Sequence, residues 1–173
     1  MTKQLLLEST KDTDLTKQYI SFWIENKRFG IDILDVKEIY SDVSVTPIYH
    51  STEDIRGYIN IRGEIYLVAD LRKILGLQKT FINVEEKLII FKDMLFESFG
   101  IVIDKIADVL NIHANKIEKF SADESETHES YLWNNEHKII DGICKLDNGL
   151  IILLNARNIM QCILSASKAS QPL

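Results

Sequence analysis

The amino-acid sequence predicts an all-β fold of two small barrels, and three observations favour it. Short apolar runs alternate with turn residues along the 173-residue chain, as they do in hairpins. The pattern of the first half recurs, in order, in the second half. Helix-capping signals mark only two segments, and both are short. Short strands at close spacing, repeated twice, favour small barrels over a parallel α/β sheet.

Four hairpins are predicted where two apolar runs flank turn residues. In one turn Gly63 follows Arg62, and glycine supplies the positive φ that tight hairpin turns favour. Asp147-Asn148-Gly149 is the clearest turn sequence in the chain. The paired runs are 18–25 with 28–33, 57–61 with 64–69, 87–92 with 95–104, and 141–146 with 150–154.

Two short helices fit the segments that follow the second and fourth hairpins. Asp70 can cap a helix over 71–75, which ends before Gly76. Asn155 can cap another helix over 156–164, near the C-terminal end.

An internal repeat relates the two halves of the chain. Phe29-Gly30-Ile31 recurs as Phe99-Gly100-Ile101, a shift of 70 positions. Farther along, Arg72 falls on Arg157, a shift of 85. The second copy therefore holds about fifteen extra residues, which we place in the acidic stretch 121–138.

The repeat and the polar ends of the chain predict its domain organisation. We expect a single domain over 18–164, made of two intertwined barrel modules. Residues 1–17 and 165–173 are expected to be flexible tails. The acidic stretch, rich in charge and poor in apolar residues, is expected to be a mobile loop.

Charge and cysteine content exclude several classes of protein. Asp and Glu outnumber Lys and Arg by 26 to 20, which argues against a protein that binds nucleic-acid phosphates. Cys144 and Cys162 form no metal-type pair and fit a reducing compartment. The apolar runs are too short to span a bilayer, and no signal-peptide core is present. A cytoplasmic protein is expected.

The sequence contains no motif that would indicate catalysis. It lacks the glycine-rich phosphate loops, the nucleophile elbow and the zinc-binding helix motif. His128, Glu129 and His137 lie together in the acidic stretch, but their spacing is not that of a metal site. We therefore expect no enzyme activity, no metal and no cofactor.

Three segments, in this order, carry a family signature. They are residues 28–39, 55–65 and 69–72, which read RFGIDILDVKEI, IRGYINIRGEI and ADLR. Residues 99–109, FGIVIDKIADV, continue the match. With them, the chain from 18 to 164 resembles the CheW family of bacterial chemotaxis coupling proteins. The resemblance implies two five-stranded, SH3-like barrels with short helices, including one near the C-terminus.

The resemblance also implies a function. The chain would be a non-catalytic adaptor without a cofactor, coupling transmembrane chemoreceptors to the chemotaxis histidine kinase. Its expected partners are the cytoplasmic tip of a methyl-accepting chemotaxis protein and the regulatory domain of the kinase. It would meet the membrane only through receptors, in arrays at the inner face, and would bind no nucleic acid.

Site residues carried over from the family fall into two groups. Lys119 and Phe120 are the expected kinase contacts. The expected receptor contacts surround a groove between the barrels and are Ile33, Val36, Glu38, Arg62, Gly63, Leu88, Ile101 and Val109. A helical receptor tip needs an apolar floor and polar residues that fix its register. The alternative is that Ile33, Ile101 and Val109 fill barrel cores.

The family resemblance implies that Glu38 and Arg62 lie beside each other, and the alternative is that they are two unrelated surface charges. The repeat places Asp108 and Asp147 at the corresponding positions, so this pair can form only in the first module. An exposed ion pair contributes only about 0–1 kcal/mol to stability. Its expected role is therefore to orient Arg62 and the Gly63 turn toward a partner.

Other functions remain open at this point. Within the family, the alternative is a scaffold for a chemosensory pathway with a non-swimming output. Outside it, a small barrel can bind nucleic acid or a metabolite. Nucleic-acid binding requires aromatic and basic residues interleaved along a strand face, and the nearest stretches, such as Phe91-Lys92, are too sparse.

Overall fold

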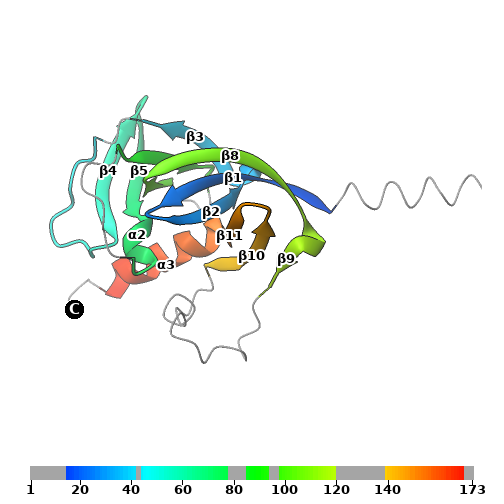
Figure 1. Cartoon of the computed structure of the whole chain (residues 1–173). Coiled ribbons are helices and arrows are strands. Elements are labelled where there is room, and N and C mark those ends of the chain that lie inside the picture. The colour runs from blue at the N-terminus through cyan, green and yellow to red at the C-terminus, as the bar shows by residue number, and fades with distance from the viewer. Residues whose placement is uncertain (1–14, 42–43, 78–84, 94–97, 120–138, 170–173) are drawn as a thin grey trace, which may run out of the picture.

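The computed structural model describes residues 15–41, 44–77, 85–93, 98–119 and 139–169 (Figure 1). The strands are β1 (Thr16–Ile24), β2 (Lys27–Asp32), β3 (Val36–Tyr40), β4 (Ile55–Ile61), β5 (Glu64–Asp70), β6 (Lys87–Phe91), β7 (Phe99–Ile103), β8 (Lys105–His113), β9 (Ile117–Glu118), β10 (Ile140–Leu146) and β11 (Gly149–Leu154). The helices are α2 (Leu71–Ile74) and α3 (Ala156–Ala169), with single 3-10 turns η1 (Ile33–Asp35) and η2 (Ala114–Lys116).

The predicted all-β fold is confirmed, with differences at the edges of elements. Each of the four predicted hairpins corresponds to an antiparallel pair: β1 with β2, β4 with β5, β6 with β7 and β10 with β11. β1 begins at Thr16 and α3 continues to Ala169, inside the ranges that were expected to be tails. The acidic stretch 121–138 lies outside the described residues, as do 1–14 and 170–173.

The strands form two sheets, and each sheet contains strands from both halves of the chain. The five-stranded sheet has the order β3-β6-β7-β5-β4, and the six-stranded sheet has the order β8-β1-β2-β11-β10-β9. The first hairpin of the chain, β1–β2, therefore lies in the same sheet as the last one, β10–β11. The family resemblance implied five strands in each barrel, and the two-residue strand β9 is the additional one.

The register of the strands follows the internal repeat. In the five-stranded sheet β5 and β7 are parallel, with Leu67 opposite Phe99. In the six-stranded sheet β11 and β2 are parallel, with Ile152 opposite Phe29. These two pairings correspond under the shifts of 85 and 70 that relate the two halves of the sequence. Each half therefore supplies a hairpin to the sheet that the other half completes.

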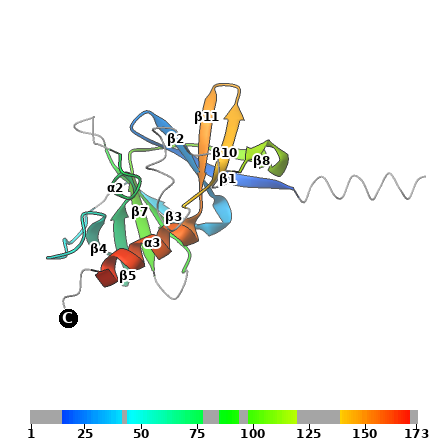
Figure 2. The same cartoon turned by 90° about the horizontal axis from the view of Figure 1, so that it is seen from below.

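The largest core lies between the two sheets. Both sheets contribute buried side chains to it, such as Phe22 and Phe29 from one and Phe91 and Phe99 from the other. Helix α3 adds Ile159, Met160 and Ile163, and both views show it running from the β10–β11 end toward the side of β4 and β5 (Figures 1 and 2). Two smaller cores lie one in each sheet. Because the sheets share this core, we propose that 18–164 is a single domain.

Among the described residues, no helix is long and apolar enough to cross a membrane. α2 is a single turn, and Asp70 caps it as predicted, its Oδ1 accepting a hydrogen bond from the Arg72 backbone N–H at 3.0 Å. Asn155 likewise accepts a hydrogen bond from the Asn158 N–H, at 3.0 Å, before α3.

Candidate functional site

The turn between β4 and β5 holds two residues in a conformation that favours glycine. Ile61 pairs with Glu64, so the loop contains only Arg62 and Gly63, with φ values of 54° and 90°. Positive φ at both positions is the requirement of a tight hairpin turn of type I′. The Gly63 N–H donates to Asn60 Oδ1 at 2.9 Å. This geometry confirms the predicted turn at Arg62-Gly63.

Arg62 occupies that turn at an energetic cost. A residue with a Cβ in the left-handed region costs about 1–2 kcal/mol relative to an ordinary conformation. Its side chain is 77% exposed, so packing does not offset the cost. Strained residues of this kind concentrate at functional sites. The position therefore points to a use for the arginine side chain itself.

Glu38 holds the Arg62 side chain. The Arg62 Nη1 donates to Glu38 Oε1 at 3.3 Å, which confirms the predicted proximity of the two residues. The Tyr40 hydroxyl donates to the other carboxylate oxygen, and this hydrogen bond raises the pKa of Tyr40. Glu38 is thus fixed from its own strand while it orients the turn. At this exposure the pair adds at most about 1 kcal/mol to stability.

A second contact ties β3 to the same hairpin. Lys37 Nζ donates to Glu64 Oε2 and to the Tyr66 hydroxyl oxygen, both at 2.7 Å. These hydrogen bonds raise the pKa of Lys37, and the one from Lys37 lowers the pKa of Glu64. β3 and β4 are the opposite edges of the five-stranded sheet. The side chains of β3 therefore reach the β4–β5 hairpin and close the sheet on itself.

The strand that carries Glu38 also has two partly accessible apolar side chains. Val36 is half-buried against the shared core, and Ile39 is exposed on the same strand. We name the set Val36, Glu38, Ile39, Arg62 and Gly63 the β3–turn surface. Ile39, Lys37 and Tyr40 were not among the predicted residues. Tyr40 lies two positions from Glu38, on the same face of a strand, and that spacing could have identified it.

The other expected receptor contacts divide into exposed and buried residues. Val109, on β8, is 52% exposed, and Ile33, in η1, is half-buried, so neither is a core residue. Leu88 and Ile101 are 0% exposed. They lie on β6 and β7, which have neighbours on both sides and covered faces. Direct contact of Leu88 and Ile101 with a receptor was therefore a wrong expectation.

The expected kinase contacts lie at the edge of what the structure describes. Lys119 is exposed just after β9, at the end of the six-stranded sheet. Phe120 lies outside the described residues. Their role stays a prediction.

The described residues offer no metal-type cluster, and the cavity beside Arg56 and Arg72 offers no nucleophile. No group of three histidine, cysteine or carboxylate side chains in this part of the chain could hold a metal ion. A cavity of about 600 Å³ is lined mainly by charged side chains, most of them ion-paired: Glu53, Arg56, Asp70, Arg72 and Lys73, with Gly76 and Leu77. This lining contains no hydroxyl, thiol or imidazole that could act as a nucleophile.

Comparison with known proteins identifies the family. The model of the CheW-like domain matches residues 18–163. The chain belongs to the CheW family. The family resemblance predicted from the sequence is thus confirmed. Proteins of the CheW family are non-catalytic chemotaxis adaptors, so this chain is an adaptor and not an enzyme.

Individual relatives support the same assignment. The chemotaxis protein CheW of Thermotoga maritima is 28% identical over 150 residues, 86% of this chain and 91% of that protein. The CheW of Klebsiella aerogenes is 34% identical over 101 residues, 58% of this chain and 60% of that protein. The crystal structure of the scaffolding protein TtCheW from Thermoanaerobacter tengcongensis superimposes with a TM-score of 0.67. The two sequences are 31% identical, and the aligned region covers 80% of this chain and 88% of that one.

Proposed function

We propose that this CheW-family adaptor binds the cytoplasmic tip of a methyl-accepting chemotaxis protein through the β3–turn surface. The observation that carries the proposal is the Glu38–Arg62 pair. An exposed arginine is kept in a left-handed turn position and is held there by a carboxylate from another strand. The arrangement contributes little to stability, so presentation of the arginine to a partner is its best explanation.

The chemistry of the β3–turn surface suits a helical partner. A receptor tip that is a helical hairpin buries an apolar stripe and needs polar contacts to fix its position along the groove. Val36 and Ile39 offer the apolar contact, and Arg62 and Glu38 offer the polar one. Val109, exposed on β8 of the other sheet, is a further proposed contact.

We further propose that the adaptor bridges the receptor to the regulatory domain of the chemotaxis histidine kinase. Lys119, exposed beyond β9, and its neighbour Phe120 are the proposed kinase contacts. Recruitment to receptor arrays at the inner face of the membrane then follows from binding both partners. The adaptor would reach the membrane only through the receptor.

Co-sedimentation with receptor-containing membranes, with and without the kinase, tests this function. We expect Glu38→Ala and Arg62→Ala each to weaken receptor binding about fivefold or more, as central interface residues do. Receptor should be required for the kinase and the adaptor to sediment together.

A matched control comes from another exposed ion pair, between helix α2 and the segment that precedes β4. Lys73 Nζ lies 3.1 Å from Glu53 Oε2, and both side chains are exposed. Lys73→Ala removes a similar pair and should leave receptor binding unchanged. The double reversal Glu38→Arg with Arg62→Glu should recover part of the affinity that either reversal loses, because the residues act as a unit. Wild-type binding by both alanine variants would refute the assignment of the surface.

A further inference from the structure

Arg72 is a buried arginine whose role the adaptor function does not account for. It belongs to the Asp70-Leu71-Arg72 motif, which helped to identify the family, yet it lies apart from the β3–turn surface. Its side chain is only 4% exposed. A guanidinium removed from water is stable only when several charged or polar groups surround it. Its partners therefore indicate what the residue does.

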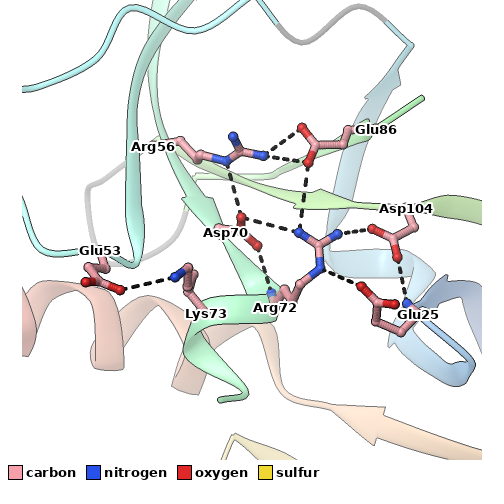
Figure 3. Close-up of polar contacts among 8 residues, drawn as sticks. All are labelled: Glu25, Glu53, Arg56, Asp70, Arg72, Lys73, Glu86 and Asp104. Atoms are coloured by element: carbon pink, nitrogen blue, oxygen red, sulfur yellow. Dashed lines mark hydrogen bonds and ion pairs between the residues drawn. The ribbon is translucent and has the colours of Figure 1, made fainter. Parts of the chain in front are cut away.

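The guanidinium contacts four carboxylates from separate segments of the chain (Figure 3). Nε lies 3.5 Å from Glu25 Oε1, and Nη1 lies 3.6 Å from Asp70 Oδ2 and 3.9 Å from Glu86 Oε1. Nη2 donates to Asp104 Oδ1. The contact with Asp104 is a hydrogen bond, whereas Nε has no hydrogen-bond partner in the described part of the chain and contacts Glu25 as an ion pair. A planar guanidinium presents its charge to several carboxylates in fixed directions, and an ammonium group cannot present the same fork.

These carboxylates belong to both sheets. Glu25 is in the turn between β1 and β2 of the six-stranded sheet, whereas Asp70 ends β5 of the five-stranded sheet. Asp104 lies between β7 and β8, where the chain passes from one sheet to the other. Asp104 Oδ2 also accepts a hydrogen bond from the Glu25 backbone N–H at 2.6 Å. Arg72 thus joins the two sheets at the point where the chain crosses between them.

A second arginine strengthens the five-stranded side of this junction. Arg56 Nη2 donates to both oxygens of Glu86 at 2.6 Å, and its Nε lies 3.3 Å from Asp70 Oδ2 (Figure 3). Asp70 and Glu86 are therefore held by two cations. These two carboxylates are thus fixed in position on the five-stranded sheet, where they contact Arg72.

The internal repeat provides a comparison. Arg157 occupies the position that corresponds to Arg72, but its side chain is exposed, and Asn155 stands in place of Asp70. The hairpin-and-helix unit therefore folds in the second module without a buried arginine. The cluster of Arg72 with its carboxylate partners, which we name the Arg72 junction, is therefore present in the first module only. The hairpin-and-helix unit does not require it in order to fold.

We propose that Arg72 is a positioning residue that fixes the six-stranded sheet relative to the five-stranded sheet. Asp104 leads directly into β8, which carries Val109, while the five-stranded sheet carries Glu38 and Arg62. Holding Asp104 and Glu25 against Asp70 therefore sets how these two parts of the proposed receptor site face each other. The inference rests on the proposed receptor binding, which it extends.

Two measurements on the same variants test the proposal. The first is the distance between spin labels on Ile65→Cys and Leu150→Cys, exposed positions on different sheets, in a Cys162→Ala background. Cys144 is buried and stays unlabelled. The second is receptor co-sedimentation of the unlabelled protein. Both are made well below the unfolding temperature.

We expect Arg72→Met to broaden or shift the inter-sheet distance distribution and to weaken receptor binding about tenfold. Arg72→Lys, which keeps the charge but not the fork, should give an intermediate result in both measurements. The matched control is Arg157→Met, which should change neither. If Arg72→Met does not fold, Arg72→Lys and Asp104→Asn carry the test with the same expected directions.

The outcomes separate the two proposals. A distance distribution that stays narrow and unshifted in the folded Arg72 and Asp104 variants overturns the positioning role, whatever happens to receptor binding. If the distribution broadens but Glu38→Ala and Arg62→Ala bind receptor normally, the positioning of the sheets stands and the assigned receptor surface fails.

Discussion

Glu38 and Asp108 occupy corresponding positions in the two halves of the chain, yet their ion pairs differ. Glu38 pairs with Arg62, an exposed residue of a turn, and the contact joins opposite edges of the five-stranded sheet. Asp108 pairs at 3.2 Å with Arg28, whose side chain is 8% exposed. Arg28 lies on β2, with Asp108 on β8 and β1 between them.

The Arg28 pair is part of the packing of its sheet. Arg28 Nη2 also donates to Ser21 Oγ at 3.0 Å, and its guanidinium lies 5.8 Å from the centre of the Trp23 ring. The Ser21 hydroxyl donates to the Asp108 carbonyl at 2.7 Å. These contacts connect β2, β1 and β8, whereas the buried Arg28 Nε has no hydrogen-bond partner among the described residues. Corresponding positions of the repeat therefore differ in role: Asp108 joins strands within its sheet, whereas Glu38 holds the side chain of an exposed turn.

The largest expected effect tests whether folding and receptor binding are separable. Leu88→Ala and Ile101→Ala should each lower the free energy of unfolding by about 2–5 kcal/mol, because they leave cavities in filled cores. Urea denaturation measures this loss. Ile65→Ala, at an exposed position, is the control and should cost little. A loss below about 0.5 kcal/mol for both core variants would contradict the burial described for them.

A smaller effect should distinguish the two ion pairs directly. Arg28→Ala removes hydrogen bonds and packing from a buried site and should cost about 1–3 kcal/mol of stability. Arg62→Ala should cost less than about 0.5 kcal/mol, because its side chain is exposed. Thermal unfolding and receptor co-sedimentation on both variants give the comparison. We expect Arg28→Ala to bind receptor normally below its unfolding temperature, and equal stability losses would remove the distinction.

The smallest expected effect has the opposite sign. Arg62→Gly relieves the left-handed strain at φ 54° and should raise the unfolding free energy by about 0.5 kcal/mol, net of the lost ion pair. The same variant should lose receptor binding. Arg62→Ala, which keeps the strain and loses the side chain, is the matched comparison. If Arg62→Gly is less stable than Arg62→Ala, strain at the turn is not significant.

Local signals in the sequence predicted much of this molecule. The Arg62-Gly63 turn followed from glycine chemistry, and the caps of both helices followed from Asp70 and Asn155. The repeat was visible in the sequence, but the two parallel pairings that correspond under it were not predicted, because the partners in each are far apart along the chain. The proximity of Glu38 and Arg62 came from the family resemblance and is confirmed by the ion pair between them.

The predictions that were wrong or absent all concern contacts between residues that are far apart in the sequence. Leu88 and Ile101 have the same character as exposed apolar strand residues, and only their positions on central strands show that they are buried. The Arg72 junction unites Glu25, Asp70 and Asp104, which no spacing in the sequence connects. The contact of Lys37 with Tyr66 likewise depends on how far the five-stranded sheet curls.

The exchange of hairpins between the sheets has a consequence for how the protein folds during synthesis. All strands of the five-stranded sheet lie between residues 36 and 103, so that sheet can assemble once this stretch has left the ribosome. β1 and β2 are made earlier, but β2 must wait for β11 to pair Phe29 with Ile152. At about 5–20 residues per second, the hairpin spends several seconds with an unsatisfied edge. Such long-range pairing gives a high contact order and slow folding. Until the last strands arrive, this unpaired strand edge exposes the nascent chain to aggregation.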